Sequence, residues 1–151
     1  MHIVLHRPEI PPNTGNVGRL CVAIGARLHV VHPIGFSMDE RAVRRAGLDY
    51  WRHVDLVEHV DDEAFWRWAS GRRVHLFSTR GAAAYTQCRF EAADVLVFGR
   101  ETVGLPAELL ERHGAWRIPM VEGPIRSLNL GNAVSVIAYE ALRQSRPQLF
   151  G

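Results

Sequence analysis

The chain has 151 residues, of which 47% are hydrophobic and 23% are charged, a composition typical of one globular domain. Its formal net charge is only +2, so charge alone does not indicate a nucleic-acid-binding protein. No apolar run approaches the roughly 18 residues of a membrane span, and the first residues lack the features of a signal peptide. We therefore expect a single domain over residues 1–151, located in the cytoplasm.

All 18 basic residues are arginines, because the chain contains no lysine. Arginine suits planar, bidentate contacts with phosphate groups. A GC-rich genome would also favour arginine over lysine. The absence of lysine therefore does not by itself indicate an RNA partner.

Short apolar runs typical of strands alternate with helical patterns along the chain. In chain order we expect the strand Ile3–Leu5, the helix Gly15–Gly25, the strand Leu28–Val31, the helices Asp39–Ala46 and Asp62–Ala69, the strands Val74–Phe77 and Val95–Phe98, the helix Pro106–Arg112, the strand Trp116–Ile118 and the helix Asn132–Gln144. This alternation predicts an α/β fold in which helices flank a parallel sheet on both faces.

The first expected helix has one apolar stripe at helical spacing, formed by Val17, Leu20, Cys21 and Ile24. Arg19 lies off this stripe and shares a face of the helix with Asn16. Asn13 and Thr14 are the candidate N-caps, because short polar side chains favour that position.

The cysteines and histidines do not form a recognisable metal motif. Cys21 and Cys88 lie far apart and outside any Cys-x-x-Cys pattern, which predicts two buried, reduced thiols. His29 and His32 are the closest histidine pair. A zinc ion needs three or four ligands, so we expect no metal there.

The last expected helix is apolar on more than one side. Its main stripe consists of Val134, Ile137, Ala138, Ala141 and Leu142. Ala133 and Val136 extend the apolar surface around the helix. A small monomer has little room to bury such a helix, so we expect a homodimer interface on it.

Two glycine-containing loops, 98–106 and 118–132, follow strand-like runs in the C-terminal half. Loops at the carboxyl ends of neighbouring parallel strands form a ligand-binding crevice in α/β folds. The sequences G-x-G-x-x-G, G-x-x-x-x-G-K-[ST] and G-x-S-x-G are absent, which disfavours an ordinary dinucleotide-binding fold, a P-loop NTPase and an α/β-hydrolase.

Three segments together resemble the three motifs of the SPOUT (SpoU–TrmD) RNA methyltransferases: residues 8–20, 98–106 and 118–135. Residues 44–50 also resemble a block of the single-domain TrmL branch, so the resemblance covers essentially the whole chain. It implies a SPOUT α/β-knot with a C-terminal trefoil knot, S-adenosylmethionine as cofactor, and a homodimer.

The resemblance implies six cofactor-binding residues: Phe77, Gly99, Ile118, Met120, Ser127 and Leu128. Gly99 would let the backbone approach the cofactor because it has no Cβ. The Ser127 hydroxyl could form a hydrogen bond with the cofactor. Taken singly, Phe77, Ile118 and Leu128 would be ordinary core residues, and only the combination of motifs favours a site.

The resemblance also implies Arg19 and Tyr139 as catalytic residues, and the need for a proton acceptor adds Glu101 as a third candidate. A guanidinium stays protonated in proteins, so Arg19 would hold a phosphate and stabilise the developing alkoxide rather than act as a base. A substrate phosphate or the Glu101 carboxylate could accept the proton of the ribose hydroxyl, or Glu101 could only brace Asn16 or Arg19. Tyr139 could line the target-nucleotide pocket or belong to the core or the dimer interface.

For contact with RNA, the positions that flank the expected site are Arg7, Asn16, Arg80 and Arg126. Arg41, Arg44 and Arg45 form one basic helical face, which a solvated surface explains equally well.

The resemblance to the TrmL branch implies 2′-O-methylation of the wobble nucleotide, cytidine or uridine 34, in the tRNA anticodon loop. Another tRNA or rRNA site, or a catalytically silent knotted RNA-binding protein, are the alternatives. Gly18, Arg100 and Gly131 depart from the usual motif residues, and the third motif is one residue longer around 123–125. These departures concern the expected substrate pocket rather than the expected cofactor site.

Overall fold

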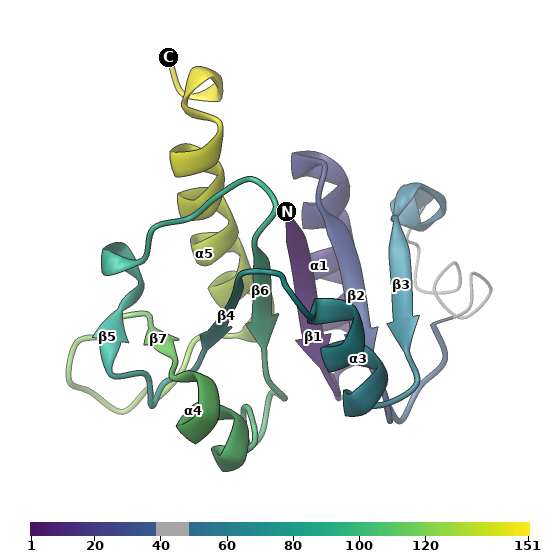
Figure 1. Ribbon diagram of the computed structural model, residues 1–151, viewed down its shortest axis with the longest axis horizontal. Coiled ribbons are helices and arrows are strands. Elements are labelled where there is room, and N and C mark those ends of the chain that lie inside the picture. The colour runs from purple at the N-terminus through teal and green to yellow at the C-terminus, as the bar shows by residue number, and fades with distance from the viewer. Residues whose placement is uncertain (39–48) are drawn as a thin grey trace.

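The computed structural model describes residues 1–38 and 49–151, and within them seven strands form one sheet (Figure 1). The strands are β1 (His2–His6), β2 (Arg27–Val31), β3 (Leu56–His59), β4 (Val74–Phe77), β5 (Ala83–Ala84), β6 (Val95–Phe98) and β7 (Trp116–Arg117). Their order is β3-β2-β1-β6-β4-β7-β5, and every neighbouring pair is parallel. The predicted parallel α/β fold is therefore confirmed.

Helices cover both faces of this sheet. The α-helices are α1 (Pro11–Ile24), α3 (Asp62–Ala69), α4 (Ala107–His113) and α5 (Leu130–Ser145), and the short 3₁₀ helices are η1 (Asp49–His53), η2 (Tyr85–Gln87) and η3 (Pro147–Leu149). In Figure 1, α3 and α4 lie in front of the sheet, and α1 and α5 pack against each other behind it.

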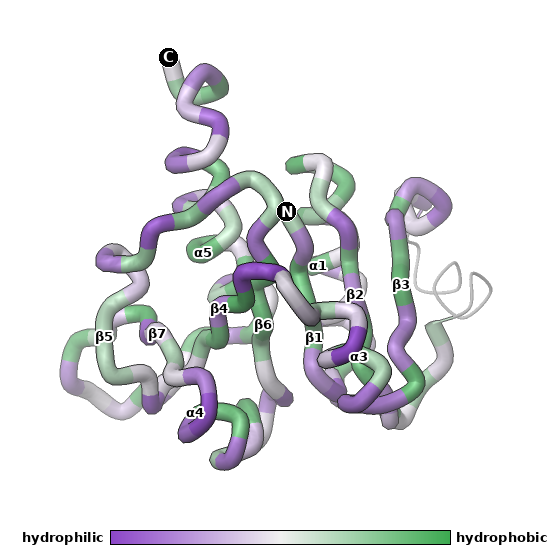
Figure 2. The backbone as a smooth tube through the Cα atoms, in the orientation of Figure 1, coloured by the Kyte–Doolittle hydropathy of each residue, from purple (hydrophilic) through white to green (hydrophobic). Residues whose placement is uncertain are grey.

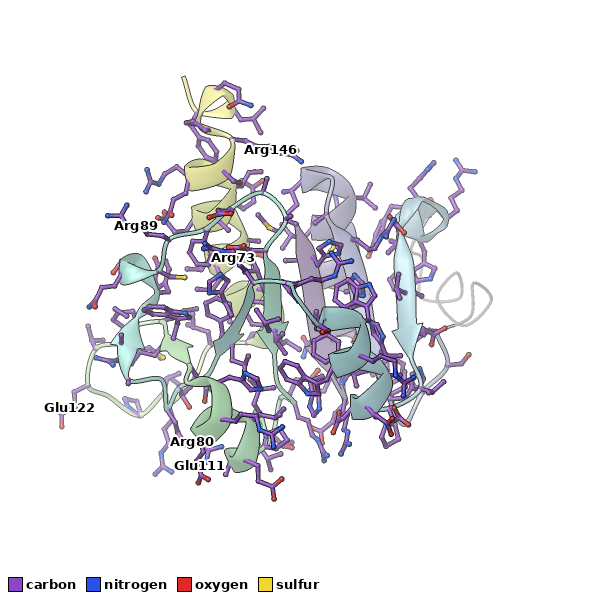
Figure 3. All side chains as sticks on the ribbon, viewed as in Figure 1. Arg73, Arg80, Arg89, Glu111, Glu122 and Arg146 are labelled. Atoms are coloured by element: carbon purple, nitrogen blue, oxygen red, sulfur yellow. The ribbon has the colours of Figure 1, made fainter. Side chains whose placement is uncertain are left out.

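The hydrophobic core consists of two clusters, one on each face of the sheet, because successive side chains of a strand point to opposite faces. Ile3 and Leu5 of β1 point into the cluster under α1 and α5. Val4, between them, points into the cluster under α3 and α4, which contains Phe65. Figure 2 shows the central strands as mainly hydrophobic, and Figure 3 shows charged side chains such as Arg89 projecting from the rim.

The observed elements match most of the expected ones. β4, β6 and α3 have the predicted bounds, while the strand β3 and the two-residue strand β5 were missed. β3 was missed because Leu56–His59 is short and contains a glutamate, so it has no continuous apolar run. The expected helix Asp39–Ala46 lies outside the described residues.

The start of α1 differs from the prediction. The helix begins at Pro11 rather than Gly15, and Ile10 occupies the N-cap position without a capping side chain. Prolines suit the first turn because its amides have no partner within the helix. The prediction that Asn13 or Thr14 caps the helix was therefore wrong; both lie buried inside it.

Gly18 is explained by the packing of η1 against α1. A Cβ at residue 18 would lie 2.5 Å from the Trp51 ring. Trp51 is buried and thus occupies the space that a larger side chain at residue 18 would fill.

Cys21 and Cys88 are both buried and free, as predicted. Burial raises the pKa of the Cys21 thiol to about 12 and is the main reason that the pKa of Cys88 rises to about 11. Both thiols are therefore protonated at neutral pH, which makes them poor nucleophiles.

Three histidines form a hydrogen-bonded row across β1, β2 and β3. His2 Nδ1 lies 3.0 Å from His29 Nε2, and His29 Nδ1 lies 3.0 Å from His59 Nε2. His32 instead lies 2.9 Å from a Glu58 oxygen. Among the described residues, no group of three or more histidine, cysteine or acidic side chains is arranged to hold a metal ion, and no helix is long and apolar enough to cross a membrane.

Candidate functional site

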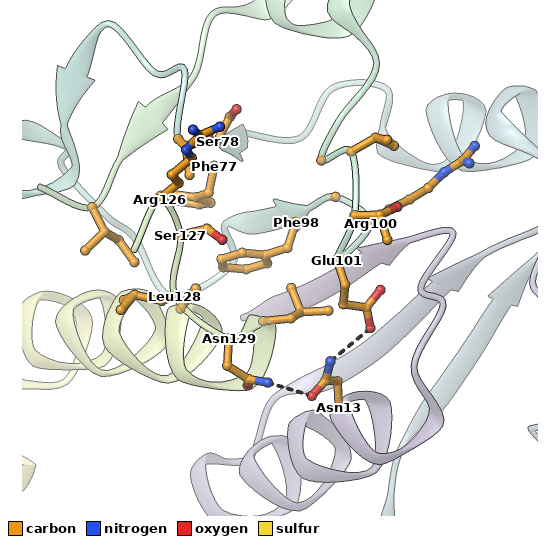
Figure 4. Close-up of a pocket in the computed structure, with 18 of the residues that line it drawn as sticks. Asn13, Phe77, Ser78, Phe98, Arg100, Glu101, Arg126, Ser127, Leu128 and Asn129 are labelled. Carbon is orange, nitrogen blue, oxygen red and sulfur yellow. Dashed lines mark hydrogen bonds between the residues drawn. The ribbon is translucent and has the colours of Figure 1, made fainter. Parts of the chain in front are cut away.

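A cavity of about 470 Å³ opens where the carboxyl ends of β4, β6 and β7 meet the start of α5 (Figure 4). Its walls are the segments 77–80, 98–104 and 126–130, together with Ile118, Met120 and Ala133, and with Ile10 and Asn13 from the start of α1. This is the crevice that the two glycine-containing loops predicted. Its volume lies within the range of roughly 300–1,000 Å³ that is usual for small-molecule sites.

Two stacked phenylalanines form an apolar wall of the cavity. Phe77 and Phe98 are paired across β4 and β6, and their ring centroids lie 5.0 Å apart with planes inclined by 16°. Both side chains are buried in the core as well as lining the cavity. The core role and the binding role, treated as alternatives for Phe77, are therefore compatible.

The loop after β6 closes tightly on itself. Arg100 and Gly104 exchange backbone hydrogen bonds of 3.3 and 3.0 Å. A Cβ on Gly99 would lie 2.2 Å from the carbonyl carbon of Gly104, which is far inside contact distance. Gly99 is thus required for the loop to fold back on itself. The sequence suggested a different reason for this glycine, namely the close approach of a cofactor.

Two carboxylates join this loop to the segment before α1. Glu101 accepts hydrogen bonds from the amides of Glu9 (2.8 Å) and Ile10 (3.1 Å). Glu9 in turn accepts from the amide of Thr102 (3.2 Å) and from its hydroxyl (2.7 Å). Hydrogen bonds to a carboxylate are among the stronger ones in proteins, so these reciprocal contacts hold the two loops together.

Asn13 extends this network to α5 (Figure 4). Its amide nitrogen donates to Glu101 Oε1 at 3.2 Å, and its oxygen accepts from the amide nitrogen of Asn129 at 2.9 Å. Asn129 is the N-cap of α5 and accepts from the amides of Gly131 and Asn132. The chain Glu101–Asn13–Asn129 therefore connects all three motif segments at the cavity.

Sequence reasoning did not select Asn13 or Asn129 as site residues. The sequence predicts Asn13 only as a helix cap, and it predicts no separate role for Asn129 within the third motif. An asparagine directly before a predicted helix is a capping signal, and this signal could have identified Asn129.

Three arginines give the cavity a positive rim: Arg80, Arg100 and Arg126. Arg80 is anchored by a hydrogen bond from its guanidinium to the Leu105 carbonyl at 3.1 Å. Among the described residues that line the cavity, Glu101 is the one acidic side chain. The positive rim of the cavity therefore favours contact with a negatively charged substrate.

The cavity brings together most of the predicted site residues. All six predicted cofactor-binding residues line it: Phe77, Gly99, Ile118, Met120, Ser127 and Leu128. Glu101 and two of the expected RNA-contacting arginines, Arg80 and Arg126, line it as well.

Four predicted residues lie outside the cavity. Arg19 and Asn16 are exposed on α1, and Tyr139 is exposed on α5. Arg7 forms an ion pair of 2.8 Å with Asp62 at the start of α3. Glu101 contacts neither Arg19 nor Asn16, so the alternative in which it braces one of them is not supported; its partners lie nearer the start of α1.

Comparison with known proteins gives consistent matches over nearly the whole chain. Residues 1–139 match the SpoU rRNA Methylase family. The chain is 47% identical over 147 residues to the tRNA (cytidine(34)-2'-O)-methyltransferase of Escherichia coli K12, covering 95% of this chain and 93% of that one.

Two solved structures share the fold. One, described as giving structural insights into the 2-OH methylation of C/U34 on tRNA, is 51% identical, with a TM-score of 0.88 over 95% of this chain and 94% of the other. The other is the SpoU methyltransferase AviRb from Streptomyces viridochromogenes in complex with the cofactor AdoMet. It is 26% identical, with a TM-score of 0.79, and the match covers all of this chain and 61% of AviRb.

Proposed function

Because the chain belongs to the SpoU rRNA methylase family, we propose that it transfers a methyl group from S-adenosylmethionine to a ribose hydroxyl of tRNA. It is a methyltransferase, and its target is the 2′-hydroxyl of nucleotide 34, a cytidine or uridine in the anticodon loop. The observation that carries this assignment is the 47% identity, over nearly the full length of both chains, to an enzyme named for that reaction.

The cavity suits S-adenosylmethionine in size and in chemistry. Phe77, Ile118 and Leu128 offer apolar surface to a purine ring, and the backbone of 118–120 can form hydrogen bonds with its edge. The Ser127 hydroxyl can bind a polar group of the cofactor. When bound, the cofactor supplies a methyl group activated by a positively charged sulfur.

The ribose oxygen must approach that methyl group in line and must lose its proton. Alignment of the two reactants can lower the barrier substantially. Arg19 holds the phosphate next to the target nucleotide and stabilises the developing alkoxide. It does not accept the proton, because a guanidinium remains charged.

Glu101 acts mainly by positioning. Three hydrogen bonds to its carboxylate support this role, since they join the 99–104 loop to the segment at the start of α1. A phosphate of the substrate is the other candidate for the proton acceptor. Arg80 and Arg126, at the rim of the cavity, contribute contacts to the RNA backbone.

The active form is a homodimer with the C-terminal trefoil knot of SPOUT proteins, working in the cytoplasm. The dimer is supported by an exposed stripe on α5 that includes Val136 and Tyr139. The knot is supported by the path of the chain after β7, which passes the 99–104 loop along the same cavity before α5 packs on α1. Tyr139 would then belong to the dimer interface, and Asn16 and Arg7 would form parts of the tRNA-binding surface.

The test is transfer of a labelled methyl group to tRNA by the purified protein and by Arg19→Ala. We expect the variant to lose at least roughly a hundredfold in turnover, as when one transition-state donor is removed, while its affinity for the cofactor is unchanged. Arg112→Ala, an exposed arginine at the end of α4, is the matched control and retains activity. Cofactor binding without transfer to any RNA would instead indicate a silent RNA-binding protein.

A further inference from the structure

We propose that Tyr50 is a positioning residue that holds the guanidinium of Arg19 ready for the RNA. This inference rests on the proposed function, because it gives Arg19 its role in methyl transfer. It adds a residue from η1, outside the three motif segments.

The contact itself is a cation–π interaction. The Arg19 Cζ atom lies 5.8 Å from the centroid of the Tyr50 ring, inside the range of about 6 Å in which such pairs attract. Among the described residues, no hydrogen bond or ion pair holds the Arg19 side chain. The tyrosine ring is therefore the group that restricts an otherwise free, exposed side chain.

Tyr50 is itself fixed to the same helix. Its hydroxyl donates a hydrogen bond of 2.8 Å to the carbonyl of Gly15. In an α-helix the carbonyl of residue 15 faces the amide of residue 19, so the hydroxyl and the ring contact one turn of α1. Burial raises the pKa of the Tyr50 phenol above its usual value, and the hydroxyl stays a donor at neutral pH.

Trp51, the residue after Tyr50, fixes the position of η1 along α1. Trp51 is buried, and its ring lies directly over Gly18. Since Gly18 has no side chain, η1 can approach α1 closely enough for Tyr50 to reach both Gly15 and Arg19. The unusual glycine in the first motif thus forms part of the support for the arginine.

This arrangement favours catalysis because a free arginine must lose much rotamer freedom when it binds a phosphate. A side chain that already lies over a ring loses less of that freedom at the reaction step. The position of Arg19 away from the cofactor cavity makes the support more important, because no cavity wall restrains it.

The test compares Tyr50→Phe with Tyr50→Leu in single-turnover assays at saturating cofactor and tRNA. Phenylalanine keeps the ring and should retain turnover within about twofold, whereas leucine removes it and should lose roughly five- to tenfold. Neither variant should change the dissociation constant for S-adenosylmethionine. Tyr85→Leu, in η2 and away from α1, is the matched control and should keep its turnover.

An Arg19→Gln background separates positioning from a general loss of structure. If Tyr50 acts through Arg19, Tyr50→Leu causes no further loss there; an equal fold loss in both backgrounds would overturn the proposal. Wild-type turnover in Tyr50→Leu would overturn it as well.

A spectroscopic readout is independent of activity. The ring should shift the NMR resonance of the Arg19 Nε–H group, and this shift should persist in Tyr50→Phe and vanish in Tyr50→Leu. An unchanged resonance in Tyr50→Leu would contradict the contact. If the wild-type protein transferred no methyl group to tRNA while the shift behaved as expected, the proposed function would fail and the Tyr50–Arg19 contact would stand.

Discussion

Gly18 and Trp51 show how one residue can determine how closely two segments pack. Alanine at residue 18 would gain up to about 1 kcal/mol of helix propensity. Its Cβ would also lie 2.5 Å from the Trp51 ring, and overpacking costs about 1–3 kcal/mol. We expect Gly18→Ala to lower the free energy of unfolding by about 1–2 kcal/mol in urea denaturation.

The same substitution in a Trp51→Leu background provides the control. With the indole ring removed, Gly18→Ala should be neutral or stabilising relative to Trp51→Leu alone. A stabilising effect in the wild-type background would contradict this account of Gly18.

At the level of single residues, the sequence predicted the side chains that line the cavity better than the hydrogen-bonded groups that support its walls. Ser127 and Ile118 follow a strand end, and the loops that carry them are visible in the sequence. The network of Glu101, Asn13 and Asn129 joins residues 88 and 116 positions apart. No local pattern encodes such contacts, because they depend on how the segments come together in three dimensions.

At the level of elements, the N-cap of α5 connects helix stability to the cofactor site. Removing an asparagine cap typically costs about 1–2 kcal/mol. Asn129→Ala should therefore lower the melting temperature, and it should weaken cofactor binding because Ser127 and Leu128 directly precede the cap. Thermal denaturation and calorimetric titration measure the two effects.

Asn129→Asp is the informative control. Aspartate can still accept from the amides of Gly131 and Asn132, but it cannot donate to Asn13. It should retain most of the helix stability and lose cofactor affinity if the bond to Asn13 shapes the cavity. Wild-type stability and affinity in Asn129→Ala would contradict the role assigned to this cap.

The histidine row across β1, β2 and β3 predicts sensitivity to acid. Burial, with the neighbouring His2 and His59, lowers the pKa of His29 to about 3. The unfolded chain, with a histidine pKa near 6.5, then binds more protons than the folded one below that pH, so stability falls as pH falls. For His29 alone, the loss between pH 8 and pH 5 is about 2 kcal/mol.

His29→Gln removes the titrating group while keeping a polar side chain. Urea unfolding should show a shallower loss of stability between pH 8 and pH 5 in this variant than in the wild type. A residual slope is expected because burial also lowers the pKa of His6 and His59. Identical slopes in both proteins would contradict the assignment of the effect to His29.

A helix or strand was predictable where its buried residues form a recognisable apolar pattern in the sequence. β6 is a continuous apolar run and β4 is apolar except for His75, and the bounds of both matched. α1 began earlier than its apolar stripe because prolines, which lack an amide donor, fill its first turn. β5 has only two residues and forms because β7 lies beside it, so no property of its own residues marks it as a strand.

At the level of the whole molecule, the exposed stripe on α5 makes the oligomeric state testable. Val136→Glu places a charge on an apolar, 37% exposed position, so it should dissociate a dimer without unfolding the chain. Light scattering should give twice the chain mass for the wild type and one chain mass for the variant. Glu111→Gln on α4, on the opposite face of the sheet, is the control.

A monomeric wild-type protein that is fully active would contradict the proposed dimer. Loss of methyl transfer in the monomeric variant, with cofactor binding retained, would support an RNA-binding surface that needs both copies.

The central claim is methylation of the ribose of nucleotide 34, and mass spectrometry of the RNA product tests it most directly. Unmodified tRNA is incubated with the protein and S-adenosylmethionine, digested, and mapped for 2′-O-methyl nucleotides. We predict a new 2′-O-methyl group at cytidine or uridine 34 and at no other position. Methylation at a different nucleotide, with position 34 unchanged, would contradict the proposed function.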